Sequence, residues 1–275
     1  AATAVDVGKA TPLTRVVAPD SLRMPWGQYI NDAEIHAPEK LTLTGVLMQS
    51  SNTGLVQIAG KVDSKTRYSY MQKFGIGSKT GVNFEGESSG LLSNYQTWDR
   101  MTDKVVMFGQ GVSLTPIQTA MIYQAIANKG VRLSPVLVEG CRDRNGNLVR
   151  TTVPEPVRVI SESTASQTID MLEKVVELGP IGKTARIPGY RIAGKTGTAQ
   201  IAEGRGYGSL HAVSFVGMAP ADDPQYVVAV TAYKSRNVSN SLGATPGFVA
   251  IMKQVLKTYK IPPATTKSKK LAVRW

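Results

Sequence analysis

Two short segments carry side chains whose types and spacing could do chemistry. One is Ser50-Ser51-Asn52, which follows an apolar stretch, and the other is Lys195-Thr196-Gly197-Thr198, which lies in a run typical of a strand. Because strand side chains alternate between two faces, Thr196 and Thr198 share one face, beside the Lys195 ammonium. Two hydroxyls next to a positive charge suit a substrate carboxylate, so the second segment predicts an anion-binding site.

The motif Lys-Thr-Gly occurs twice, so the second copy serves as an internal control. Lys79-Thr80-Gly81 lies in a glycine-rich loop with no strand around it, and we interpret it as a surface turn. Lys195 instead interrupts an apolar strand, where a charged residue needs a reason. Gly194 and Gly197 remove side chains there, which lets another backbone or a ligand approach. For Ser50-Ser51-Asn52, ordinary cap and turn chemistry is the structural alternative.

Other kinds of site find little support in the sequence. Residues 75–80 depart from a phosphate-binding loop because Ser78 separates the last glycine from the lysine, and the glycines miss the dinucleotide spacing by one residue. His36 and His211 are the only histidines, so a His-rich metal site and a paired histidine base are both excluded. Cys141 is the only cysteine, so no disulfide forms within the chain. A catalytic base would have to be a lysine or a carboxylate.

The composition fits a folded chain with a basic surface. Of 275 residues 42% are hydrophobic, and 32 Lys and Arg against 20 Asp and Glu give a net charge of +12. Such a charge suits nucleic acid, anionic lipid or an acidic cell-wall polymer. The basic residues are mostly scattered and no nucleic-acid-binding motif is present, so we expect no nucleic-acid partner. Residues 261–275 contain Pro262-Pro263 and a lysine-rich stretch, and we expect a flexible basic tail.

Hydrophobic periodicity places the two motifs in an α+β fold. Helical spacing predicts helices at 41–48, 54–74, 115–129, 161–178 and 246–259. Alternation and turn residues predict three strands, Tyr190–Ile201, His211–Met218 and Gln225–Tyr233, with a turn at 203–206. Residues 11–38 contain several prolines and are predicted to be irregular. Helices, then an antiparallel meander, then a covering helix indicate helices packed on an antiparallel sheet, with residues 1–260 as one domain.

Four segments resemble the transpeptidase domain of class B penicillin-binding proteins. They are residues 41–52, 108–118, 188–200 and 215–220, and two of them hold the Ser-x-Asn and Lys-Thr-Gly motifs of that family. The division-associated members are the most similar, and the resemblance covers about residues 1–260 in register. It implies the fold of penicillin-binding proteins and serine β-lactamases, an antiparallel sheet flanked by helices plus a helical subdomain, here without its N-terminal part.

The resemblance also implies an activity and a role for each motif residue. The activity is that of a peptidoglycan D,D-transpeptidase, which cross-links stem peptides through a serine acyl-enzyme, binds β-lactams and needs no cofactor or metal. By this resemblance Ser50 passes a proton towards the leaving nitrogen, and Asn52 holds a motif lysine and the substrate amide. Lys195 orients Ser50 and attracts the substrate carboxylate, which Thr196 and Thr198 bind. The Thr198 N–H forms half of the oxyanion hole.

One motif of the family, Ser-x-x-Lys, occurs nowhere in the 275 residues. In the family it opens the helix whose end we assign to Ala1–Gly8, so the resemblance places the nucleophile upstream of Ala1. It also implies a membrane anchor outside this chain, a location on the extracytoplasmic face of the membrane, and division proteins as partners. Ser51 stands where class A β-lactamases have Asp, which favours a transpeptidase.

Two other functions stay open from the sequence. Without its nucleophile the chain could be a structural or interaction fragment. A β-lactamase or β-lactam sensor of the same fold would need a deacylating water, and no motif clearly supplies the base for it. In the family two of five sheet strands come from outside this segment, so the resemblance leaves an apolar edge strand at Gln225–Tyr233 unpaired. An exposed edge of this kind is a template for aggregation.

Overall fold

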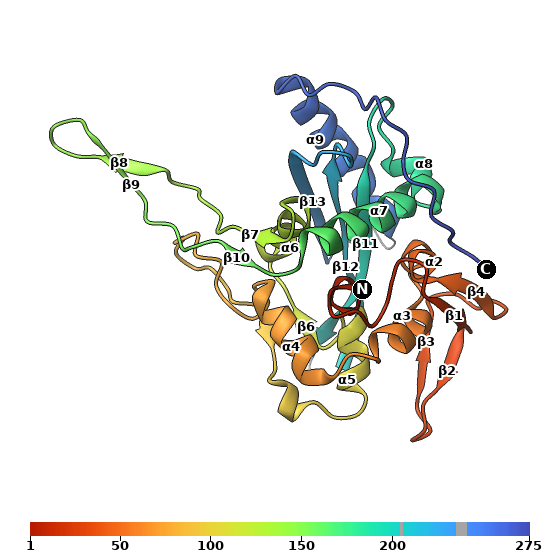
Figure 1. Ribbon diagram of the computed structural model, residues 1–275. Coiled ribbons are helices and arrows are strands. Elements are labelled where there is room, and N and C mark those ends of the chain that lie inside the picture. The colour runs from red at the N-terminus through yellow and green to blue at the C-terminus, as the bar shows by residue number, and fades with distance from the viewer. Residues whose placement is uncertain (204–205, 235–240) are drawn as a thin grey trace.

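A three-stranded antiparallel sheet lies at the centre of the molecule (Figure 1). The computed structural model describes residues 1–203, 206–234 and 241–275. The strands lie side by side in chain order, β11 (Ala193–Glu203), β12 (Gly206–Ala219) and β13 (Tyr226–Tyr233). The antiparallel meander confirms the α+β prediction, while the predicted turn at 203–206 includes residues 204 and 205, which lie outside the described residues.

Three of the predicted helices cover the two faces of this sheet. They are α6 (Pro116–Ala127), α7 (Glu162–Leu178) and α9 (Thr245–Thr258). On one face Phe215 of β12 packs edge-to-face on Phe248 of α9, with ring centroids 4.7 Å apart. On the other face Met218 of β12 packs with residues of α6 and α7. The helices predicted around residues 115–129, 161–178 and 246–259 are thus confirmed.

Helix α7 is the element that joins the sheet to the rest of the domain. Ten of its 17 residues are buried. Met171 packs with residues of α2 (Leu43–Gln49), Leu172 packs with Ala193 of β11, and Val175 belongs to the cluster that includes α9. One helix therefore contributes to three clusters of the core, and it fixes α2 relative to the sheet.

Short strand pairs replace the irregular region predicted for residues 11–38. β1 (Arg15–Ala18) pairs with β4 (Glu39–Thr42), and β2 (Ser21–Arg23) pairs with β3 (Tyr29–Asn31). The prediction is wrong because strands of three or four residues are too short to show alternation among prolines. β4 also takes the first two residues of the helix predicted at 41–48, so α2 begins at Leu43.

The single helix predicted over residues 54–74 is two helices. α3 (Asn52–Ala59) ends at Gly60, and α4 (Ser64–Lys73) begins after Asp63. The Asp63 carboxylate accepts a hydrogen bond from Thr66 N at 2.8 Å, which is the usual N-cap interaction. The apolar positions on which the prediction rests, from Leu55 to Val62, all lie before α4, and α4 itself is mostly polar, so the prediction should have ended at Gly60.

The other elements are short. α1 (Ala2–Asp6) is the helix end predicted before Gly8, whose φ is +68°. Three further strand pairs are β5 (Leu91–Leu92) with β6 (Val112–Ser113), β7 (Val131–Arg132) with β10 (Val157–Arg158), and β8 (Gly140–Arg142) with β9 (Leu148–Arg150). The β8–β9 hairpin extends away from the body of the domain (Figure 1). The remaining helical turns are α5 (Thr102–Val105), α8 (Gly182–Ala185), Tyr95–Thr97, Val106–Phe108 and Ser241–Ala244.

Residues 261–275, which we call the strap, are not the free tail that the composition predicts. The strap runs from α9 past α7 to the neighbourhood of α2 and β4 (Figure 1). Ser268 Oγ donates to Glu177 Oε2 at 2.8 Å, and the Trp275 indole donates to Leu41 O at 3.2 Å. The expectation of a solvated end is therefore wrong, because lysine content alone does not reveal the polar partners that these residues find on the domain.

We predict that residues 1–275 produced alone self-associate. Within the described part of the chain, β13 pairs only with β12, and its residues from Tyr226 to Val230 are half-buried. Such an apolar edge can pair with a second molecule despite the net charge of +12. Sedimentation velocity measures the association, with the protein extended upstream of Ala1 as a monomeric control. A monomeric 1–275 chain with a sharp cooperative melt would contradict this prediction.

Candidate active site

Ser50 lies at the junction of two helices. α2 begins after Thr42, whose Oγ1 accepts a hydrogen bond from Gly45 N at 3.2 Å, and it ends at Ser50 in the left-handed conformation, with φ 58° and ψ 34°. Ser51 then caps α3, because its buried Oγ accepts a hydrogen bond from Gly54 N at 3.0 Å. The middle residue of the motif is thus structural, and the turn that it stabilises leaves Ser50 exposed.

Lys195 reaches Ser50 from the sheet. Its Nζ donates a hydrogen bond to Ser50 Oγ and lies 3.3 Å from Thr196 Oγ1. The contact depends on α7, which packs against β11 and against α2. At the end of α7, a Cβ on Gly179 would lie only 3.3 Å from the Met48 side chain of α2, so the two helices are close beside the site. The structure therefore brings three of the predicted site residues together.

The Lys195 ammonium is half-buried, and no counter-ion faces it among the side chains that the structure describes. Burial lowers the pKa of Lys195 from its usual 10.5 to about 8. None of the described carboxylates forms an ion pair with it. A desolvated cation without a negative partner attracts an anion strongly, because a bound anion would compensate for the lost hydration.

Gly197 and Thr198 extend the site along β11. A Cβ on Gly197 would lie 2.7 Å from Ser214 Oγ of the neighbouring strand, so a side chain at position 197 would have to displace that hydroxyl. The Thr198 side chain is exposed. The strand pleat puts Thr196 and Thr198 on one face and the Lys195 stem on the other, and Nζ then bends back towards the Thr196 hydroxyl.

Asn52 contacts a different part of the molecule. Its Nδ2 donates to Asn31 O of β3 at 2.9 Å, and the next amide, Thr53 N, donates to Asp32 Oδ1 at 2.9 Å. The structure thus places Asn52 against the β2–β3 hairpin rather than against Lys195. Asn31 and Asp32 anchor the motif, and the sequence analysis missed both residues. The sequence showed only that Asp32 is an acidic residue in a region predicted to be irregular. It could not show that the Asp32 carboxylate contacts the start of α3.

The second Lys-Thr-Gly copy lies in a loop with no strand around it, as predicted, but its middle residue is buried rather than on the surface. Lys79 is exposed in the loop that follows α4. Thr80 is buried, and its N–H donates to Glu87 Oε1 at 2.7 Å, which closes the loop on itself. The two copies of one short motif therefore have different structural settings, and only Lys195 contacts Ser50.

The fold and this arrangement match a known family. A model of the penicillin binding protein transpeptidase domain matches residues 1–255. The chain belongs to this family. Penicillin-binding protein PbpB of Mycolicibacterium smegmatis is 36% identical over 274 residues, which are 95% of this chain and 42% of that protein. Stage V sporulation protein D of Bacillus subtilis is 37% identical over 195 residues, 69% of this chain and 30% of that protein.

Solved structures of penicillin-binding proteins share the architecture. Penicillin binding protein 3 of Mycobacterium tuberculosis, complexed with ampicillin, superposes with a TM-score of 0.91 at 33% identity, over 100% of this chain and 63% of that one. A peptidoglycan synthetase from Bifidobacterium adolescentis gives a TM-score of 0.91 at 31% identity, over 100% of this chain and 50% of that one. The chain spans less than half the length of the curated relatives described above.

We predict that Lys195 titrates near pH 8. Its lowered pKa follows from burial, and a chemical-shift titration of ¹³C-labelled lysine side chains measures it directly. The lysine binds its proton less tightly in the folded protein than in the unfolded chain. Its contribution to the free energy of unfolding therefore rises with pH between about 8 and 10.5. A Lys195 resonance that titrates near the ordinary value of about 10.4 would contradict this prediction.

Proposed function

We propose that this chain is the larger part of the catalytic domain of a serine-type peptidoglycan D,D-transpeptidase. The observation that carries the proposal is the hydrogen bond from Lys195 to Ser50 at the edge of a transpeptidase-family sheet. The Lys195 ammonium, which pairs with no carboxylate in the described part of the chain, supports binding of the terminal carboxylate of a stem peptide. Thr196, within reach of the same ammonium, supplies a hydroxyl for that carboxylate.

The proposed reaction needs a serine from upstream of Ala1. Its oxygen attacks the penultimate D-alanyl carbonyl carbon, the peptide bond to the terminal D-alanine breaks, and a serine ester remains. The serine proton ends on the nitrogen of the departing D-alanine. An amine from a second stem peptide then attacks the ester, forms the cross-link and returns a proton to the serine oxygen. Water in place of the amine would give hydrolysis.

The residues of this chain would transfer the proton and stabilise the oxyanion. Ser50, polarised by Lys195, can pass the proton to the leaving nitrogen, because its hydroxyl can accept one proton and donate another. The Thr198 N–H would donate to the oxyanion together with the serine N–H. Within the described residues β11 pairs only with β12, so its other edge can take an extended peptide by strand addition. Asn52 would have to leave the Asn31 carbonyl to hold the substrate amide.

The setting of the reaction is part of the proposal. We propose a role in septal wall synthesis on the extracytoplasmic face of the membrane, with division proteins as partners and an anchor outside this chain. Within the described residues, no helix combines the length and the hydropathy that a membrane crossing needs. The net charge of +12 supports an anionic surrounding such as an acidic cell-wall polymer.

We predict that fluorescent penicillin labels the protein extended upstream of Ala1 and does not label residues 1–275 alone. The label forms an ester with the nucleophile, which the proposal puts in an upstream Ser-x-x-Lys. Gel fluorescence and intact-mass spectrometry measure the adduct. An extended protein that takes no label would reject the transpeptidase in favour of a structural or interaction module. Rapid loss of the label would indicate a β-lactamase instead.

We predict that Lys195→Ala in the extended protein slows acylation on the order of a hundredfold, as removal of one charge-stabilising group commonly does. Lys79→Ala is the matched control, since it removes a lysine from the same three-residue motif in an exposed loop. Its effect should stay within roughly twofold, as for most surface substitutions. Stopped-flow acylation measures both rate constants. Equal effects of the two substitutions would contradict the assignment of Lys195 to the site.

A further inference from the structure

The strap adds backbone contacts to β4 at the point where β4 becomes α2. Thr42 N donates to Val273 O at 3.1 Å, and Thr42 Oγ1 donates to Ala272 O at 2.7 Å. Arg274 continues the pairing in an antiparallel bridge with Leu41. Because Thr42 is also the N-cap of α2, these contacts hold the first turn of the helix that leads to the candidate site.

A glycine in α2 makes this close approach possible. Gly45 is the buried third residue of the helix, and a Cβ there would lie 1.9 Å from Val273 O and 2.9 Å from Val273 C. Such distances are far below van der Waals contact, so any side chain at position 45 must displace either the strap or the helix. Glycine within a helix costs about 1 kcal/mol relative to alanine, and here it makes room for a backbone contact.

The end of the strap is anchored by an aromatic ring. The Trp275 ring contacts two cations, with Arg15 at 5.2 Å and Lys40 at 5.1 Å from its centroid. The backbone N–H of Trp275 donates to Lys40 O at 3.3 Å, and its indole N–H donates to Leu41 O at 3.2 Å. These contacts tie the strap to both strands of the β1–β4 pair.

The middle of the strap follows one face of α7. Lys269 Nζ donates to Asp170 at 2.7 Å. Ser268 Oγ accepts from Lys174 Nζ at 2.9 Å and donates to Glu177 at 2.8 Å. Asp170, Lys174 and Glu177 succeed one another by about one helical turn, so they form a polar row along α7. The strap therefore connects the helix that packs on the sheet with the helix that carries Ser50.

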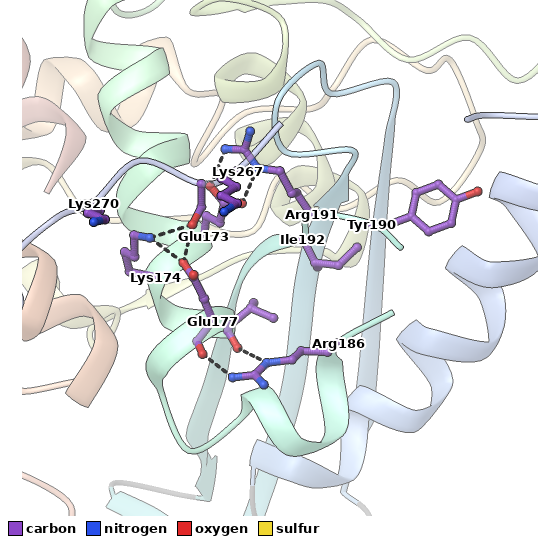
Figure 2. Close-up of a pocket in the computed structure, with 11 residues that line it drawn as sticks. Glu173, Lys174, Glu177, Arg186, Tyr190, Arg191, Ile192, Lys267 and Lys270 are labelled. Atoms are coloured by element: carbon purple, nitrogen blue, oxygen red, sulfur yellow. Dashed lines mark hydrogen bonds and ion pairs between the residues drawn. The ribbon is translucent and has the colours of Figure 1, made fainter. Parts of the chain in front are cut away.

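A cavity of about 450 Å³ lies between the strap and α7 (Figure 2). Its buried Glu173 carboxylate is already paired with Arg191 at 2.7 Å, and Glu177 is paired with Lys174. Lys267 and Lys270 of the strap line the cavity as well. The cavity shows that the middle of the strap does not pack continuously on α7. The strap is held by apolar contacts of Ile261 and Leu271 near its ends and by polar contacts along α7.

We propose that the strap positions Ser50 against Lys195, with Val273 and Trp275 as positioning residues. The inference rests on the proposed function of this site. α2 has seven residues, which makes it about 10 Å long and rigid at 1.5 Å per residue. A shift of its Thr42 end therefore moves its Ser50 end. Misplacement of a catalytic group by about 1 Å can cost on the order of a hundredfold in rate.

The first test substitutes the glycine without changing the strap. In the extended protein, Gly45→Ala should slow penicillin acylation at least about tenfold, because the new Cβ displaces Val273. The matched control is Gly247→Ala, also at the third position of a helix, where a Cβ would lie an ordinary 3.4 Å from Val230. Both substitutions favour helix formation, so only the clash distinguishes them. Equal acylation rates for Gly45→Ala and Gly247→Ala would overturn the proposal.

The second test separates positioning from folding. Deletion of residues 264–275 should slow acylation to the same degree, and adding Gly45→Ala to the deletion should slow it no further, because the clash partner is gone. Trp275→Ala should show a smaller loss that Trp275→Phe partly restores. The labelled fraction at saturation should stay at the wild-type level, since mispositioned enzyme still reacts slowly. A reduced labelled fraction with an unchanged rate would indicate a purely structural strap.

The two proposals fail in different ways. If the unaltered extended protein takes no penicillin, the proposed function fails and the positioning role fails with it. If the unaltered protein is labelled and the strap-deleted protein is labelled equally fast, the function stands and only the inference about the strap is overturned.

Discussion

One buried helix determines where the two halves of the candidate site meet. α7 packs against β11, which carries Lys195, and against α2, which ends at Ser50. Because it contributes to three clusters of the core, it has little freedom to shift relative to either neighbour. The hydrogen bond between residues 145 positions apart in sequence is therefore a consequence of packing rather than of local structure.

The same packing gives the site its electrostatic character. Lys195 is held where burial lowers its pKa to about 8, and within the described residues no carboxylate compensates for its charge. Ser50 is held in the left-handed conformation, which costs a non-glycine residue roughly 1 kcal/mol or more. Ser50 lies between α2, capped by Thr42, and α3, capped by Ser51, and the two capped helices hold it in that conformation. Both features raise the free energy of the unliganded site, and a bound anion would recover part of it.

The sequence predicted the parts of the molecule that have strong local signals. The long amphipathic helices and the three strands of the meander follow from periodicity over many residues, and the resemblance to the family selected Ser50 and Lys195. Periodicity could not show the three- and four-residue strands between 15 and 42. It also did not show that the helix predicted over 54–74 is divided, with Asp63 as the N-cap of its second part. The strap was missed for another reason. Its anchors are backbone atoms, the Trp275 ring and polar side chains whose partners lie far away in the sequence, and composition shows none of these pairings.

The account depends on Ser50 and Lys195 acting as one unit. A double-mutant cycle with Ser50→Ala and Lys195→Ala in the protein extended upstream of Ala1, read as the rate constant of penicillin acylation, tests this directly. If the hydrogen bond between them carries the function, the double variant should be no slower than the slower single variant, because each substitution already removes the shared interaction. Rate losses that multiply in the double variant would show that the two residues act independently, and would contradict the account.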